Sequence, residues 1–206
     1  MLVLVDAMGG DKAPDEIVKG CIDAINESEG YDVLLIGDVN KINRILENEK
    51  FDARRIQLHH TDEVIHNDDM PTKAIKSKKN SSMVVGLNML KEKYGDVFLS
   101  AGNTGALLAG AMLTLGRIKG VQRPALAPII PSASGGTMLI DAGLNTNCKP
   151  ENLLQFGIIG SLYMRNVFGI KNPRVGLVNI GQENRKGSEV IKQAYEKLTA
   201  SDINFI

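Results

Sequence analysis

The sequence has no tryptophan, only two cysteines, and no excess of either charge. Aromatic residues make up 4% of the 206 positions, which gives little support for stacking of nucleic-acid bases on aromatic rings. The formal net charge of zero also lacks the basic character typical of nucleic-acid-binding proteins. Cys21 and Cys148 are too few for a disulfide framework. We therefore expect a cytoplasmic protein with no nucleic-acid partner.

Long hydrophobic runs are absent as well. No apolar run approaches the roughly 18 residues of a membrane span, and Asp6 ends the first run after four residues, which argues against a secretory signal. No Gly-x-Gly-x-x-Gly follows a predicted strand, so a dinucleotide cofactor is not expected. His59, His60 and His66 flank an acidic loop without a known ligand spacing, so we expect no metal site.

Short apolar runs alternate with amphipathic segments along most of the chain. Such alternation predicts an α/β fold with a mostly parallel sheet flanked by helices, and we interpret residues 1–206 as a single α/β domain region. An extended segment at 124–131 is punctuated by proline and fits an edge or non-ladder position. The predicted strands cover residues 2–5, 33–36, 56–58, 97–99, 138–140 and 175–178, with a further run at 203–206.

Polar residues and glycines follow the predicted strands, at Asp6, Gly37, Ser100, Asp141 and Asn179. In a parallel sheet these positions lie along one edge, where α/β proteins bind ligands. The segment 100–106, Ser-Ala-Gly-Asn-Thr-Gly-Ala, stands between an apolar strand and a packed helix. Its glycines allow close backbone approach, and a helix N-terminus offers free N–H groups. The sequence therefore predicts an anion pocket, most simply for phosphate; a well-capped strand-to-helix turn is the structural alternative.

Five segments occur together and in order: 6–11 (Asp-Ala-Met-Gly-Gly-Asp), 80–83 (Asn-Ser-Ser-Met), 100–106, 123–126 (Arg-Pro-Ala-Leu) and 181–187 (Gly-Gln-Glu-Asn-Arg-Lys-Gly). The set resembles the bacterial phosphate acyltransferases of the PlsX family, and the resemblance runs from residue 2 to residue 206. It implies a fold like those of isocitrate and isopropylmalate dehydrogenases and of phosphotransacetylases. Two departures are Leu144, where the family commonly has alanine, and a chain that stops before family length, apparently truncated by about the last third.

The resemblance also implies an activity. Enzymes of this family move a fatty acyl group from acyl carrier protein to inorganic phosphate, and a membrane acyltransferase uses the acyl phosphate for phospholipid synthesis. By the same resemblance we expect a homodimer that touches the membrane surface peripherally. The acidic carrier protein would meet a basic surface. The candidates for that surface are Lys73, Lys76, Lys78, Lys79, Arg117 and Lys119.

The chemistry needs orientation and charge stabilisation, because phosphate is a competent nucleophile and a thiolate is a good leaving group. The residues alone would leave Lys186 as a surface lysine before a helix, but the match of 181–187 to the family motif implies that Lys186 is the cation. Asn179 and Asn145 are candidate donors to the acyl carbonyl. A phosphotransacetylase acting on acyl-CoA and a non-catalytic anion-binding fragment are the alternatives. The expected phosphate cradle is Ser100, Gly102, Asn103, Thr104 and Gly105, with Gly9, Gly10 and Asp11 as a neighbouring wall.

Overall fold

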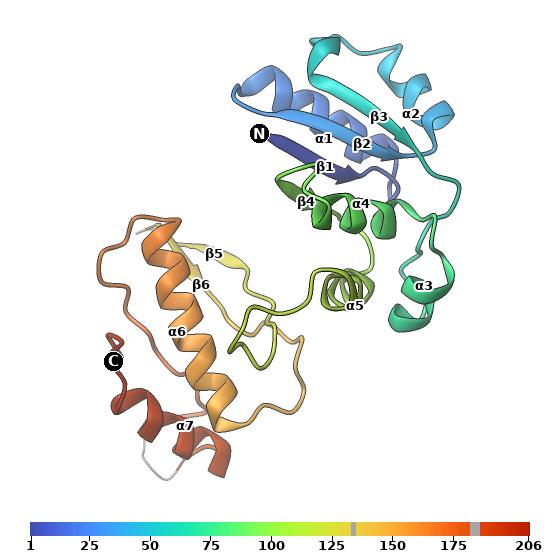
Figure 1. The fold of residues 1–206 in the computed structure, drawn as a ribbon. Coiled ribbons are helices and arrows are strands. Elements are labelled where there is room, and N and C mark those ends of the chain that lie inside the picture. The colour runs from blue at the N-terminus through green and yellow to red at the C-terminus, as the bar shows by residue number, and fades with distance from the viewer. Residues whose placement is uncertain (133–134, 182–185) are drawn as a thin grey trace. The chain divides into compact units, whose positions relative to one another are not determined.

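The computed structural model describes residues 1–132, 135–181 and 186–206. The chain forms two compact units, Met1–Gly116 and Arg117–Ile206, whose elements are drawn in Figure 1. Each unit is described by itself below. A single α/β domain over residues 1–206 stays a prediction.

The first unit contains a four-stranded parallel sheet (Figure 1). Its strand order is β3-β2-β1-β4. The sheet confirms the four predicted strands of this unit. The two central strands, β1 and β2, are buried over most of their length, whereas the edge strands β3 and β4 stay partly exposed. The bounds are β1 Leu2–Asp6, β2 Asp32–Gly37, β3 Ile56–His60 and β4 Val97–Leu99.

Helices follow the strands, and several begin at side chains that accept from their own first turn. Asp38, Ser81 and Asn103 are such N-caps, and Pro71 occupies the first position of its helix as predicted. The bounds are α1 Asp15–Glu27, α2 Val39–Leu46, the 3-10 turn η1 Ala53–Arg55, α3 Pro71–Ser77, α4 Ser82–Lys91 and α5 Thr104–Thr114.

The core of the first unit lies on both faces of the sheet, because alternate residues of a strand point to opposite sides. On one side Val5 and Leu35 pack with the buried residues of α1 and α2. On the other side Leu4 and Leu34 pack with residues of α4. The carboxyl ends of β1, β2 and β4 therefore meet at one edge, as the sequence predicted for Asp6, Gly37 and Ser100.

In its described residues the second unit contains two packed helices, α6 (Pro150–Asn166) and α7 (Glu189–Thr199), and a two-stranded sheet. Phe156, Ala194 and Leu198 are buried. The strands β5 (Ile129–Ser132) and β6 (Gly135–Met138) pair antiparallel. Residues 133 and 134 alone separate them in sequence, far fewer than the dozen or more that a parallel crossover needs.

Three strand predictions in this unit are wrong. Among the described residues, the run at 203–206 contributes only Phe205, to an isolated bridge. Instead of a strand over 138–140, β6 ends at Met138, and 175–178 contributes only an isolated bridge between Val175 and Phe205 among the described residues. Val178 is 78% exposed, so this run lacks the cover that a buried strand needs. Asp141 and Asn179 consequently do not lie at the ends of parallel strands. None of the helices in the described ranges has the length and apolar character that a membrane span requires.

Candidate functional site

A buried carboxylate, that of Asp6, lies where β1 ends. Asp6 is 2% exposed, and its two oxygens accept from two hydroxyls and one backbone N–H. Ser82 Oγ donates to Oδ1 at 2.5 Å, Met8 N donates to Oδ1 at 3.2 Å, and Ser100 Oγ donates to Oδ2 at 2.7 Å. These contacts tie the end of β1 to the first turn of α4 and to the loop after β4.

Ser100 takes part in two hydrogen bonds at the start of the β4–α5 loop. Its hydroxyl donates to Asp6, and the same oxygen accepts from Gly102 N at 3.1 Å. The side chain of Ser100 and the N–H of Gly102 are thus already partnered within the protein. Both residues belong to the predicted phosphate cradle, and here they shape the loop.

The β1–α1 loop and the β4–α5 loop lie in backbone contact, as the predicted cradle and wall require. A Cβ placed on Gly9 would lie 2.9 Å from Gly102 N and 2.5 Å from Asp6 Oδ2. A Cβ on Gly102 would in turn lie 3.2 Å from Gly9 Cα. Gly10 has a φ of +115°, and a Cβ placed on it would lie 3.3 Å from Ala101 O. Glycine is required here because the two loops approach more closely than side chains allow.

Asn103 is buried and caps α5. Its Oδ1 accepts from Ala106 N at 2.9 Å, while its Nδ2 lies 3.1 to 3.3 Å from three carbonyl oxygens of the 61–70 loop, those of His66, Asn67 and Asp69. Thr104 and Gly105 follow as the first two helical residues. Their N–H groups have no acceptor among the described residues, so the first turn of α5 keeps two donors free for a ligand.

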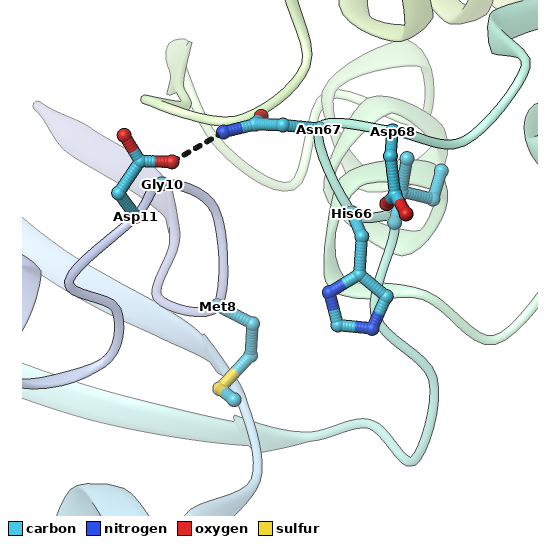
Figure 2. Close-up of a pocket in the computed structure, with 7 residues that line it drawn as sticks. Met8, Gly10, Asp11, His66, Asn67 and Asp68 are labelled. Carbon is cyan, nitrogen blue, oxygen red and sulfur yellow. Dashed lines mark hydrogen bonds between the residues drawn. The ribbon is translucent and has the colours of Figure 1, made fainter.

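A cavity of about 280 Å³ opens between the β1–α1 loop and the 61–70 loop (Figure 2). Asp11 Oδ1 accepts from Asn67 Nδ2 at 2.6 Å across it. Two carboxylates, those of Asp11 and Asp68, line this cavity, so it is less suited to an anion than the first turn of α5. The lining residues are Met8, Gly10, Asp11, Ile65, His66, Asn67 and Asp68.

In the second unit, Asn145 belongs to a turn organised by Asp141. Asp141 accepts from the backbone of Leu126, Leu144 and Asn145 and from Asn145 Nδ2. Burial raises the pKa of Asp141, but these hydrogen bonds outweigh it and lower the pKa below its usual value. Asn145 Nδ2 also donates to Pro124 O at 2.9 Å, so the amide of Asn145 is engaged within the turn.

Asn179 and Lys186 lie together. Asn179 Nδ2 donates to Lys186 O at 3.2 Å, and a Cβ on Gly187 would lie 2.5 Å from Asn179 Oδ1. Lys186 is exposed, and its amine has no ion pair among the described residues. Residues 182–185 of the same motif lie outside the described residues. No hydrogen bond within the described ranges joins Asn145 to this pair.

Lys78, a candidate for the basic surface, is less available than the sequence indicated. Lys78 Nζ donates to Val64 O at 2.8 Å and to Asp69 at 2.5 Å, so it braces the 61–70 loop. Cys148 is half-buried, and its pKa is raised by burial first and by the Asp141 carboxylate second. A thiol with a raised pKa is a poor nucleophile near neutral pH.

Sequence reasoning did not include Asp6 or Ser82 among the predicted site residues. Both lie inside motifs that carried the resemblance, Asp6 at the start of 6–11 and Ser82 within 80–83. Their signal was therefore present as residue types at strand and helix ends. What was missing was the contact between them, across 76 positions of sequence.

The fold is similar to those of two solved phosphotransacetylases. A solved phosphotransacetylase from Streptococcus pyogenes superimposes with a TM-score of 0.72 at 13% identity, covering all of this chain and 67% of that chain. A second, EutD phosphotransacetylase from Staphylococcus aureus, gives a TM-score of 0.68 at 15% identity, over the same shares of the two chains. At this identity the likeness concerns the fold alone, and it confirms the α/β architecture with a parallel sheet flanked by helices.

Sequence relatives are much closer. The phosphate acyltransferase of Acetivibrio thermocellus is 59% identical over 206 residues, which is 100% of this chain and 61% of that protein. That of Thermoanaerobacter pseudethanolicus is 52% identical over the same shares. The chain thus spans about 61% of the length of these relatives. A family model described as fatty acid synthesis protein matches residues 1–206. The chain therefore belongs to the fatty acid synthesis protein family, and its resemblance to the phosphate acyltransferases is confirmed.

Proposed function

We propose that this protein is a phosphate acyltransferase, which transfers a fatty acyl group from acyl carrier protein to inorganic phosphate. The observation that carries the proposal is the meeting of two glycine loops beside the first turn of α5, where Thr104 and Gly105 keep free N–H groups. The relatives named phosphate acyltransferase, at 59% and 52% identity, support the same activity.

Phosphate binding is assigned to the loop 100–105. The N–H groups of Thr104 and Gly105 would donate to phosphate oxygens, and the positive end of the α5 dipole would favour the negative charge. Ser100, Gly102 and Asn103 would hold the loop in shape. The neighbouring wall would be the segment of Gly9, Gly10 and Asp11, with glycine backbone nearest the anion.

In the proposed reaction a phosphate oxygen attacks the thioester carbonyl carbon, the carbon–sulfur bond breaks, and the thiolate of the carrier leaves. Negative charge develops on the carbonyl oxygen, so a nearby cation or N–H donor lowers the barrier. Lys186 would supply the cation. Asn179, which holds the Lys186 backbone and has one amide proton left, would donate to the acyl carbonyl. Asn145 would support the 124–126 segment, because both of its amide protons are engaged.

Partners follow from the proposed activity. Exposed lysines around α3 would contact the acidic carrier protein, namely Lys73, Lys76 and Lys79. Lys78 is bound to Asp69, so we assign it to the fold instead. Arg117 and Lys119 are exposed in the second unit and remain candidates. We further propose a cytoplasmic homodimer that touches the membrane surface peripherally and passes acyl phosphate to a membrane acyltransferase.

The test is a product assay on the full-length protein with two acyl donors. Purified protein is given phosphate and either acyl carrier protein thioester or acyl-CoA, and acyl phosphate is trapped with hydroxylamine as the acyl hydroxamate. Faster formation from the carrier-protein thioester, dependent on phosphate, is the expected result. Faster formation from acyl-CoA would favour a phosphotransacetylase. Binding of phosphate without any phosphate-dependent formation of hydroxamate would favour an anion-binding module and overturn the proposal.

A further inference from the structure

Asp6 is a carboxylate buried without a cation. Across the residues that the structure describes, no Lys, Arg or His lies within ion-pair distance of it, and only hydrogen bonds compensate for its burial. Burial of a charge is costly, and a well-packed apolar side chain often stabilises a protein as well or better. Packing alone therefore does not explain why a carboxylate occupies position 6, but its hydrogen-bond partners do.

The hydroxyl of Ser100 has a single proton, and Ser100 donates that proton in its hydrogen bond to Asp6 Oδ2. The lone pairs of Ser100 Oγ are consequently free to accept, and one of them takes the N–H of Gly102 at 3.1 Å. Without an acceptor at position 6, the Ser100 hydroxyl could rotate and donate elsewhere. Asp6 thus fixes the direction of the hydrogen bonds through Ser100 to Gly102, two residues before Thr104.

We infer that Asp6 is a positioning residue for the phosphate-binding loop, acting through Ser100 to hold the 100–105 backbone in the shape that leaves the Thr104 and Gly105 N–H groups free. The inference rests on the proposed function for the identity of the anion. It assigns Asp6 no contact with phosphate and no part in bond breaking. Its effect is on how well the loop receives phosphate.

Ser82 offers a built-in comparison within the same cluster. Its hydroxyl donates to the other oxygen of Asp6, at 2.5 Å, but it belongs to α4 and makes no bond to the β4–α5 loop among the described residues. Loss of either hydroxyl removes one donor from the same buried carboxylate. If Asp6 acts on stability alone, replacing either serine should have similar effects on stability and on KM for phosphate. If Asp6 positions the loop, replacing Ser100 should raise KM for phosphate and replacing Ser82 should not.

The experiment measures KM for phosphate and kcat in the full-length protein for four variants: Asp6→Asn, Ser100→Ala, Ser82→Ala and, as a control, Asp38→Asn. Asp38 is also a carboxylate at a strand end, and asparagine retains its capping role on α2. We expect Asp6→Asn and Ser100→Ala to raise KM for phosphate about 10-fold or more, the scale of one weakened hydrogen bond to a charged ligand, with a smaller change in kcat. Ser82→Ala and Asp38→Asn should leave KM near the wild-type value.

The double variant Asp6→Asn/Ser100→Ala should raise KM for phosphate no further than either single variant does. Each single change already breaks the same chain of hydrogen bonds from Asp6 through Ser100 to Gly102.

Equal KM values for Ser100→Ala and Ser82→Ala would overturn the inference, even if Asp6→Asn fails to fold. Amide hydrogen exchange of the peptide covering 100–106 separates this failure from a failure of the proposed function. If the wild type shows no phosphate-dependent transfer, the proposed function fails. In that event, faster exchange in Asp6→Asn and Ser100→Ala but not in Ser82→Ala still supports the positioning role, and unchanged exchange overturns it.

Discussion

The hydroxyl of Ser100 donates a 2.7 Å hydrogen bond to the carboxylate of Asp6, from a residue 94 positions away in sequence. The bond joins the carboxyl ends of two neighbouring parallel strands, β1 and β4. Gly9 lies directly against it, since a Cβ there would be 2.9 Å from Ser100 Oγ. The hydrogen bond between Ser100 and Asp6 therefore joins the β1–α1 and β4–α5 loops. Glycines beside it, which have no side chain, let the two backbones come this close.

Replacement of Gly9 by alanine should damage this edge. The added methyl group would lie 2.5 Å from Asp6 Oδ2 and 2.9 Å from Gly102 N, closer than real Cβ contacts allow. Overpacking of this kind costs about 1–3 kcal/mol, and we expect weaker phosphate binding as well. Urea denaturation and KM for phosphate measure the two effects.

The matched control for this prediction is Gly20→Ala, because nothing lies within 4 Å of a Cβ at that helical position in α1. Alanine there should keep or raise stability, by up to about 1 kcal/mol from helix propensity. A Gly9→Ala protein as stable and active as Gly20→Ala would show that the loops do not depend on their close approach.

Asn103 should have two separable roles. Asn103→Asp keeps an oxygen that can cap α5 but replaces the donor to the carbonyls of the 61–70 loop with a carboxylate. We expect this variant to preserve α5 and to release residues 66–69, seen as faster amide exchange there. Asn103→Ala removes the cap too, at a cost of about 0.5–2 kcal/mol, and should also speed exchange at the start of α5. Identical exchange patterns in the two variants would contradict this division.

Much of the first unit could be predicted from its sequence. Strands with continuous apolar runs, such as 33–36, and helices opened by Ser81 or Pro71 have local signals, and the structure places them where those signals lie. The strand order β3-β2-β1-β4 has no local signal, because it depends on which distant strands pair. The Asp6–Ser100 contact could not be predicted from the sequence for the same reason, because it depends on β1 pairing with β4.

The second unit shows where apolar runs mislead. The run at 175–178 has the composition of a strand, yet its only ladder contact among the described residues is the bridge from Val175 to Phe205. Composition indicates that a segment could be extended and buried, but pairing requires a partner of the right length beside it. The same limit applies to Asn145, whose residue type suggested a donor to substrate while its amide is bonded to Asp141 and Pro124.

Low pH should lower the unfolding free energy of the second unit, because Asp141 becomes protonated. Hydrogen bonds from Asn145 and from backbone N–H groups lower the pKa of Asp141 in the folded protein despite the opposing effect of burial. A lowered folded pKa stabilises the fold above the ordinary aspartate pKa of about 3.9, and the contribution is lost as pH falls through the lower folded value. The difference in unfolding free energy between wild type and Asp141→Asn should therefore be largest near neutral pH and shrink below pH about 4.

Chemical denaturation of the full chain at a series of pH values measures this difference. Asp202→Asn removes an exposed carboxylate of the same unit and controls for the loss of one negative charge. A gap between wild type and Asp141→Asn that stays constant down to the most acidic point would contradict a role for the Asp141 carboxylate in folding.

Lys186 gives the sharpest test of the proposed chemistry. Its backbone carbonyl accepts from Asn179 Nδ2, while its exposed amine has no ion pair among the described residues. Lys186→Ala therefore removes the charge and keeps the carbonyl that holds Asn179, so folding should be unaffected. Loss of one positioned electrostatic group costs about 100-fold or more in turnover, and we expect that loss in acyl phosphate formation. Lys171→Ala, which removes another exposed lysine of the same unit, should retain wild-type turnover, and an equally active Lys186→Ala protein would exclude Lys186 from the mechanism.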